Sequence, residues 1–245
     1  MAKQTPLFSA SQSAERRYTA QLKKIAKHSS ELIMKHLEDE DGAITDTDEI
    51  LRVAKYYSEA ITPFARKTAS QMLMSVANAS ARAWAANSIK IGNLAKEAIK
   101  SDAVAPTITA LRARQVELIK SIPTEAAERV HSLALEQSIG GRRSEEIQEE
   151  IARTGEVTAN RAKLIARTEV ARSNSVINAT RAKSIGATHY VWETMEDEAV
   201  RPSHEEMAGN IYAYDDPPEV EGEGNHGPGD FPNCRCFANP VLDNV

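Results

Sequence analysis

The sequence predicts an α+β fold, with long helices in the N-terminal two-thirds and a small antiparallel sheet in a loop-rich C-terminal part. Three observations support this prediction. Aromatic residues make up only 5% of the 245 residues, while alanine, serine and glutamate are abundant, a composition that favours helices over a β-sandwich. Apolar residues recur at helical spacing as far as residue 185. After Gly186 they alternate with polar residues in short runs separated by glycine and proline.

Helices are expected throughout the first 139 residues. Threonine and aspartate at 45–48 offer N-caps for one of them, and proline early in Thr62-Pro63 suits a first turn. Pro106 and Pro123 are expected to separate neighbouring helices, because proline lacks an N–H group and clashes with the preceding turn. Gly140-Gly141 is expected to end the helix that precedes it. The expected helices span about 11–37, 45–60, 62–100, 107–122 and 124–139.

The C-terminal part is expected to combine two helices with three strands. The longer helix, Thr158–Ile185, is expected to stop at Gly186. A loop over 215–232 is rich in glycine, proline and acid, and the small sheet is expected to rest on the longer helix. Residues 1–144 then form a helical region, and residues 145–245 a separate module. The remaining elements are expected at 144–152 (helix) and at 188–194, 211–214 and 236–242 (strands).

Charge is distributed unevenly along the chain. The net charge of −5 argues against a general nucleic-acid binder. Residues 157–190 carry six basic side chains and one acidic one, whereas residues 193–224 carry eleven acidic and one basic. The basic helix is expected to pack against the acidic loop; contact with a nucleic-acid backbone and ordinary surface charge are the alternatives. No secretory signal or apolar run of membrane-spanning length is evident, which predicts no membrane partner and a setting in a reducing cytoplasm, or in a particle assembled there.

The two cysteines suggest a metal site. Cys234 and Cys236 are separated by one residue, which makes an unstrained disulfide between them poor. Zinc prefers thiolate and imidazole ligands in a tetrahedron. We therefore predict a structural zinc site at Cys234, Cys236 and His204, with either His226 or Asp197 as the fourth ligand. Free buried thiols and hydrogen-bonded histidines are the alternative.

The stretch before these residues has a spacing that could serve an enzyme. Asp197, Arg201 and His204 fall at i, i+4 and i+7, so on one helical turn they would share a face. They could act as an acid–base pair with an anion clamp, but an Asp–Arg pair that pins the loop is the preferred interpretation. No nucleotide-binding loop, nucleophile elbow or metalloprotease motif occurs in the sequence. We therefore assign no catalytic residue and no residue that binds an organic cofactor.

Taken together, these C-terminal residues resemble the phage Mu F-like minor head protein family, also called phage head morphogenesis proteins. The resemblance covers about residues 145–242, and its combination of an R-T-E helix, D-x-x-V-R-x-x-H and a terminal C-R-C is more specific than any one piece. The residues that carry the resemblance are Arg167, Thr168, Glu169, Asn178, Arg181, Trp192, Asp197, Val200, Arg201, His204, Gly209, Pro228, Gly229, Pro240, Val241 and the stretch 233–236.

The resemblance implies a structural protein in the head of a tailed phage, present in few copies near the portal vertex. The implied partners are the portal protein and the major capsid or scaffold protein, with packaged DNA as a further candidate. The implied role is head assembly and DNA packaging or delivery rather than catalysis. Residues 145–245 would be the Mu F-like head morphogenesis module, and residues 1–144 the helical docking and assembly region. Two alternatives stay open: a zinc-assisted hydrolase, nuclease or ADP-ribosyl transferase-like enzyme, and a DNA-binding head component.

Overall fold

The computed structural model describes residues 8–37, 47–87, 93–139 and 144–242, which form two compact units. The sheet unit comprises Met1–Arg16, Ser70–Arg112 and Arg167–Val245, and the helical unit comprises Arg17–Ala69 and Ala113–Ala166. These units do not follow the division expected at residue 144, which rested on sequence motifs and stays a prediction. None of the described helices combines the length and apolar composition that crossing a membrane requires.

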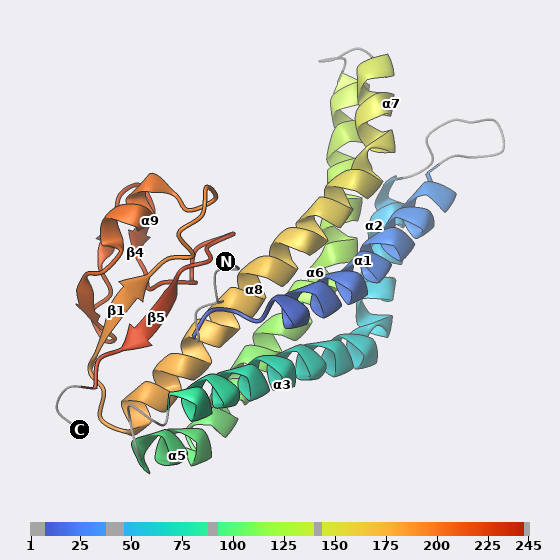
Figure 1. Cartoon of the computed structure of the whole chain (residues 1–245). Helices are drawn as coiled ribbons and strands as arrows, with labels where there is room; N and C mark the ends of the chain where they lie inside the picture. The colour runs from blue at the N-terminus through green and yellow to red at the C-terminus, as the bar shows by residue number, and fades with distance from the viewer. Residues whose placement is uncertain (1–7, 38–46, 88–92, 140–143, 243–245) are drawn as a thin grey trace. The chain divides into compact units, whose positions relative to one another are not determined.

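The predicted α+β fold is confirmed, with long helices followed by a small sheet (Figure 1). The helices at 11–37, 45–60 and 144–152 are present with minor changes of boundary, and the helix expected from residue 158 begins four residues earlier. The expected third helix corresponds to two described helices, since 88–92 lie outside the described residues, as do Thr45–Asp46 and Gly140-Gly141. The helices are α1 (Gln12–Lys35), α2 (Thr47–Ala60), α3 (Thr62–Ala86), α5 (Asn93–Lys100), α6 (Val104–Ile139), α7 (Ser144–Ala152), α8 (Thr154–Ser184) and α9 (Pro202–Met207).

The prediction that Pro123 separates two helices at 107–122 and 124–139 is wrong, because α6 continues through Pro123; Pro106 lies in the first turn of α6, after the end of α5. Two hydroxyl groups donate hydrogen bonds to carbonyls in the turn before the proline. Ser58 donates to the carbonyl of Lys120 at 2.9 Å, and Thr124 donates to that of Ser121 at 3.1 Å. Burial of the neighbouring apolar face then offsets the roughly 3 kcal/mol that an interior proline costs. That face includes Ile119, Ile122, Ala126 and Ala127.

The helical unit is held together by an apolar core between α1, α2, α6 and α7. Ile50 and Ile147 are almost fully buried in it, and each comes from a face that repeats at helical spacing. Ion pairs at the margin connect the same helices: Arg129 of α6 lies 2.6 Å from Glu150 of α7. Figure 1 shows α7 beside the last turns of α6. The core comprises Ile33, Leu37, Ile50, Ala54, Ala126, Ala127, Val130, Leu133, Ile147 and Ile151.

The sheet unit contains the predicted antiparallel sheet of three strands. β1 (His189–Glu193) lies between β2 (Ile211–Ala213) and β5 (Phe237–Pro240), and Trp192 stands opposite Ala238. The stretch expected to be only loop also forms a hairpin, β3 (Glu219–Val220) with β4 (Gly224–Asn225), so that part of the prediction is wrong. Two-residue strands leave too little alternation to be recognised in a sequence.

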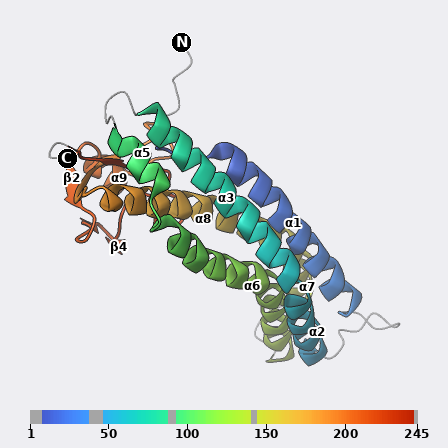
Figure 2. The same ribbon diagram turned by 90° about the horizontal axis from the view of Figure 1, so that it is seen from below.

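Polar side chains of α8 are built into the interior of the sheet unit. Asn178 Oδ1 accepts hydrogen bonds from Ser80 at 2.6 Å and from the Trp84 indole at 3.2 Å. Arg181 donates to the carbonyls of Ala98 and Ile99 at 2.8 and 2.6 Å, which caps the C-terminal end of α5. Burial lowers the pKa of Arg181. Figure 2 shows α5 close to α3 and α8, and apolar residues of all three helices share one core.

Gly186 ends α8 as predicted. Its φ is +89°, and the N–H groups of Gly186 and Ala187 bond the carbonyls of Lys183 and Ala182 at 3.0 and 3.1 Å. This is the pair of bonds that closes a helix end through a left-handed residue. The turn sends the chain directly into β1, so it sets where the sheet begins against the helix.

Replacing Gly186 with alanine should therefore destabilise the protein by about 1 kcal/mol, because an L-residue resists this conformation. No described atom lies within 4 Å of a Cβ built at this position, so a steric clash does not contribute to this loss of stability. Gly155→Ala is the matched control in the first turn of the same helix, where the added Cβ meets Ser30 at an ordinary 3.5 Å. Thermal unfolding should show a loss for Gly186→Ala alone; equal losses would contradict this account.

Candidate metal centre

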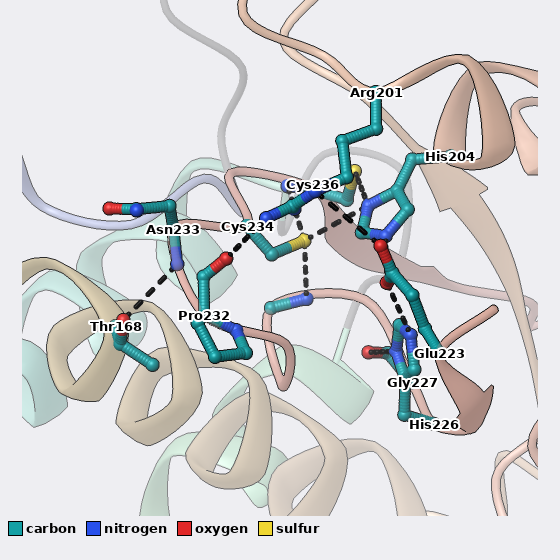
Figure 3. Close-up of polar contacts among 11 residues, drawn as sticks. Thr168, Arg201, His204, Glu223, His226, Gly227, Pro232, Asn233, Cys234 and Cys236 are labelled. Carbon is teal, nitrogen blue, oxygen red and sulfur yellow. Dashed lines mark hydrogen bonds and ion pairs between the residues drawn. The ribbon is translucent and has the colours of Figure 1, made fainter. Parts of the chain in front are cut away.

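The loop 228–233, which precedes the two cysteines, is fastened to α8 by hydroxyl side chains of that helix. Thr168 Oγ1 accepts the backbone N–H of Asn233 at 3.1 Å (Figure 3). Ser175 Oγ donates to the carbonyl of Pro228 at 2.6 Å. One bond lies at each end of the loop, so α8 fixes the position at which the cysteine segment begins.

An arginine and a glycine bring the middle of this loop against the helix. Arg172 Nε donates to the carboxylate of Asp230 at 3.2 Å, and the guanidinium also donates to the Asp230 carbonyl. Glu169, one turn earlier and almost fully buried, lies 3.4 Å from the same guanidinium. Gly229 has φ +89°, and a Cβ built there would lie 3.2 Å from the carbonyl oxygen of Ala171. A side chain at this position would force the loop away from the helix.

Helix α9 supplies the histidine of the site. Proline is well tolerated in a first helical turn, and α9 begins at Pro202 with Arg201 in extended conformation before it. His204 follows and is only 1% exposed. Its ring meets the indole of Trp192 edge-on, with ring centroids 5.6 Å apart. Since Trp192 belongs to the central strand β1, the imidazole is held against the sheet.

The two cysteine sulfurs lie on the same side of this imidazole. Cys234 Sγ and Cys236 Sγ are each 3.4 Å from His204 Nδ1, and both thiols are buried. The backbone N–H groups of Gly229 and Cys236 point at Cys234 Sγ from 3.3 and 3.4 Å. Figure 3 shows both sulfurs facing one edge of the ring. The three side-chain donors lie within 4.8 Å of one another, a spacing compatible with one shared metal ion.

A carboxylate occupies the other edge of the imidazole. Glu223, in the turn of the β3–β4 hairpin, lies 2.7 Å from His204 Nε2 and 3.0 Å from His226 Nε2 through the same oxygen, Oε2. Its second oxygen is 3.4 Å from Arg201 Nε. Figure 3 shows Glu223 between the two histidines. The hydrogen bond to Nε2 leaves Nδ1 of His204 directed at the sulfurs.

These contacts shift the ionisation of the whole cluster. The hydrogen bond with Cys236 is the main cause that lowers the pKa of Cys234 to about 4. The same partnership and burial raise the pKa of Cys236. Burial opposes charge on His204, but hydrogen bonds with Cys234 and Glu223 outweigh it and raise the pKa of His204. Burial likewise opposes the Glu223 carboxylate, and hydrogen bonds from the two histidines outweigh it and lower the pKa of Glu223.

The structure brings together three of the predicted ligands but neither candidate for the fourth. His226 does not lie within 4.8 Å of both sulfurs and His204, because it sits on the far side of Glu223. Asp197 instead pairs with the guanidinium of Arg235. The prediction of either residue beside the thiols is therefore corrected: Glu223 holds one away, and Arg235 holds the other.

The predicted Asp197–Arg201 pair is not formed either. Asp197 precedes α9, so the helical spacing that would align it with Arg201 and His204 does not exist. Arg201 instead bonds Glu223 and the carbonyl of Pro232, the latter at 2.7 Å. A surface hollow near Asp197 is lined mainly by acidic side chains and Arg235, and none of the three sulfur or imidazole donors lines it.

The remaining motif residues act inside the fold. Arg167 pairs with Glu15 of α1 at 3.2 Å, and Arg172 pairs with Asp230 of the acidic stretch. The expected packing of the basic helix against the following loop is therefore found at Arg172, and again where Lys183 pairs with Asp215. Arg181 is buried and donates to Ser80 and to two backbone carbonyls, so it is not placed to contact a nucleic acid.

Sequence reasoning missed Glu223 and Ser175. Glu223 stands three residues before His226, and this spacing was the only signal in the sequence. The signal is weak, because many surface carboxylates lie equally close to a histidine without contacting it. Ser175 lies on α8 among other small polar residues and carries no signal of its own. Both roles depend on loop conformation, which hydrophobic periodicity does not encode.

Comparison with known proteins supports the resemblance seen in the sequence. Residues 129–239 match the model of the family described as Phage Mu protein F like protein, and this segment includes most of the residues that carry the resemblance. The match contains α8, α9, both hairpin strands and the whole His–Cys cluster. No solved structure matches the chain significantly.

Two curated relatives are similar over just over half of this chain. An uncharacterized protein of Haemophilus influenzae is 34% identical over 137 residues, which are 56% of this chain and 30% of the relative. An uncharacterized protein of Methanocaldococcus jannaschii is 28% identical over 157 residues, 58% of this chain and 24% of the relative. The chain thus spans less than a third of either relative, and neither description states an activity.

The Thr168–Asn233 contact can be tested by a substitution of nearly equal shape. Thr168→Val removes the acceptor of the Asn233 N–H and should cost about 1 kcal/mol of stability. It should also speed the reaction of Cys234 with a thiol reagent, because the loop loses an attachment. Thr180→Val is the control, since the Thr180 hydroxyl donates at 2.8 Å to Val176 within the same helix. Unchanged thiol reactivity in Thr168→Val would contradict the proposed attachment.

Proposed function

We propose that this protein is a Phage Mu F-like minor structural protein of a tailed-phage head, located near the portal vertex. The family match over residues 129–239 is the observation that carries the proposal, since it relates the chain to phage head proteins. In this proposal the portal protein is the main partner, with the major capsid or scaffold protein as neighbour, and binding takes place during head assembly and DNA packaging or delivery.

A structural role fits the way the motif residues are used. Thr168, Arg172 and Arg181 form hydrogen bonds within the same chain: Thr168 with a backbone N–H, Arg172 with a carboxylate and Arg181 with backbone carbonyls. Cys234, the thiol with the lowered pKa, is only 2% exposed. A nucleophile needs access to substrate. These observations favour a structural protein over the alternative of a hydrolase, nuclease or transferase.

Exposed apolar side chains on the helical unit offer a surface for a head partner. Val157 and Leu164 lie seven residues apart on α8, so they share a face, and each is 38% exposed. Leu135 and Ile139 lie four residues apart on α6 and are exposed further, Ile139 to 83%. Helices often bind partners through such rows of apolar anchors. We assign the row on α8 to the portal protein.

The full chain should accordingly co-purify with proheads of its phage and be retained by immobilised portal protein. The double variant Val157→Ser/Leu164→Ser should lower portal retention several-fold at a temperature where circular dichroism shows that it is folded; its unfolding temperature should fall somewhat, because each side chain is only 38% exposed. Asn160→Ser/Lys163→Ser is the control, since both residues are exposed on the same helix between the two apolar ones. Absence of the protein from proheads, assembly intermediates and mature particles alike would refute the proposal.

Packaged DNA is a second candidate partner, favoured by the exposed face of α1. Lys23, Lys24, Lys27 and Lys35 are all exposed there, and Glu31 is the acidic residue among them. Such a lysine row suits sequence-independent contact with phosphates. The proposal differs from the one drawn from sequence, which placed this contact on α8.

Lys23→Glu/Lys24→Glu should therefore weaken salt-dependent binding to duplex DNA by at least about tenfold at low salt, since two phosphate contacts become repulsive. Lys96→Glu/Lys100→Glu on α5 makes the same change of charge at exposed positions and should have little effect. Mobility-shift titrations at several salt concentrations give the comparison. Equal weakening by both pairs would show a general charge effect and overturn the α1 assignment.

A further inference from the structure

The distances within the His–Cys cluster match those of a metal site. In a tetrahedral zinc site with Zn–S of about 2.3 Å and Zn–N of about 2.0 Å, a sulfur and a nitrogen ligand stand about 3.5 Å apart. Both Cys234 Sγ and Cys236 Sγ lie 3.4 Å from His204 Nδ1. Two thiols and an imidazole nitrogen are thus already spaced as ligands of one ion, from segments 30 and 32 residues apart in sequence.

The surroundings of the cluster are those of metal-bound groups. A histidine that binds a metal through one nitrogen usually donates its other N–H to a carboxylate, as His204 Nε2 does to Glu223 at 2.7 Å. Two backbone N–H groups point at Cys234 Sγ, an arrangement that stabilises a thiolate.

A buried donor beside the second thiol points the same way. The indole of Trp192 is completely buried, and its Nε1–H has no regular hydrogen-bond partner among the described residues. Trp192 and Cys236 belong to the same cluster of buried residues. Metal binding would make Cys236 a thiolate, which is a far better acceptor for this N–H than a neutral thiol.

We propose that Cys234, Cys236 and His204 bind one zinc ion through the two thiolates and Nδ1. A water molecule supplies the fourth ligand, because within the described residues no further Cys, His, Asp or Glu joins this group of donors. Soft thiolates with an imidazole select zinc over calcium or magnesium, which prefer oxygen. His226 takes no part in coordination and instead holds Glu223 in place from 3.0 Å.

The ion would tie together three segments of the sheet unit. His204 belongs to α9, Cys236 immediately precedes β5, and Cys234 directly follows the loop 228–233 that α8 fastens. A sheet of three short strands is marginal alone, and binding energy at a structural zinc site adds directly to folding. The inference goes beyond the proposed head function, since zinc could stabilise the module whatever its partner.

The test uses the full chain, stripped of metal by a chelator under reducing conditions and then titrated with Zn²⁺ or Co²⁺. We expect one zinc per chain, slower reaction of both thiols with a thiol reagent, and a higher unfolding temperature. The cobalt form should show thiolate-to-cobalt charge transfer and the intense visible bands of a tetrahedral site, with two sulfur ligands by X-ray absorption. A chain that takes up no stoichiometric zinc and keeps its thiol reactivity would overturn the proposal.

Variants then identify the ligands. His204→Gln and Cys236→Ser should abolish stoichiometric binding, and Glu223→Gln should weaken it about 10- to 100-fold, as loss of such a carboxylate does elsewhere. His226→Gln is the control and should retain one zinc with two sulfur ligands. If a ligand variant fails to fold, the wild-type X-ray absorption spectrum still decides, because one sulfur or none would refute the assignment. Loss of zinc in His226→Gln with retention in His204→Gln would overturn the ligand set.

Discussion

The attachment of the loop 228–233 to α8 is the constraint on which the C-terminal architecture depends. The segment has almost no regular structure, so its position cannot come from a sheet ladder. It comes instead from Thr168, Arg172 and Ser175, which contact the loop from successive turns of one helix. Gly229 permits the close approach, because a side chain there would meet the backbone of α8. Cys234 and Cys236 follow this loop directly, so the attachment of the loop also positions their thiols.

The histidine of the site is positioned by the sheet rather than by α8. β1 carries Trp192 into the interior, and the indole supports the imidazole of His204. Glu223 of the β3–β4 hairpin then fixes the orientation of that ring. A helix, a strand and a hairpin thus converge on one small cluster. This convergence explains why the motif residues are scattered over more than 60 positions of the sequence and still form one structural unit.

The spacing of apolar residues and the positions of glycine and proline were sufficient to predict the α+β class, most helices and the three strands of the sheet, because local patterns determine those elements. Pro123 misled the prediction, since its cost inside α6 is offset by burial of the surrounding apolar face and by a hydrogen bond from Ser58, which is remote in sequence. For the site, residue chemistry correctly grouped Cys234, Cys236 and His204. It placed His226 and Asp197 beside them wrongly, because the partners that hold these two away, Glu223 and Arg235, are determined by loop conformation.

The central claim is that α8 holds the cysteine loop in a fixed, protected conformation. Native-state hydrogen exchange of individual amides tests it most directly. The N–H groups of Gly229, Asn233 and Cys236 each have a partner in this arrangement, at 3.1 to 3.4 Å. They should exchange nearly as slowly as the amides of β1. Exchange of all three at the rate of exposed loop amides would show that the loop is not held by the helix, and would contradict the account.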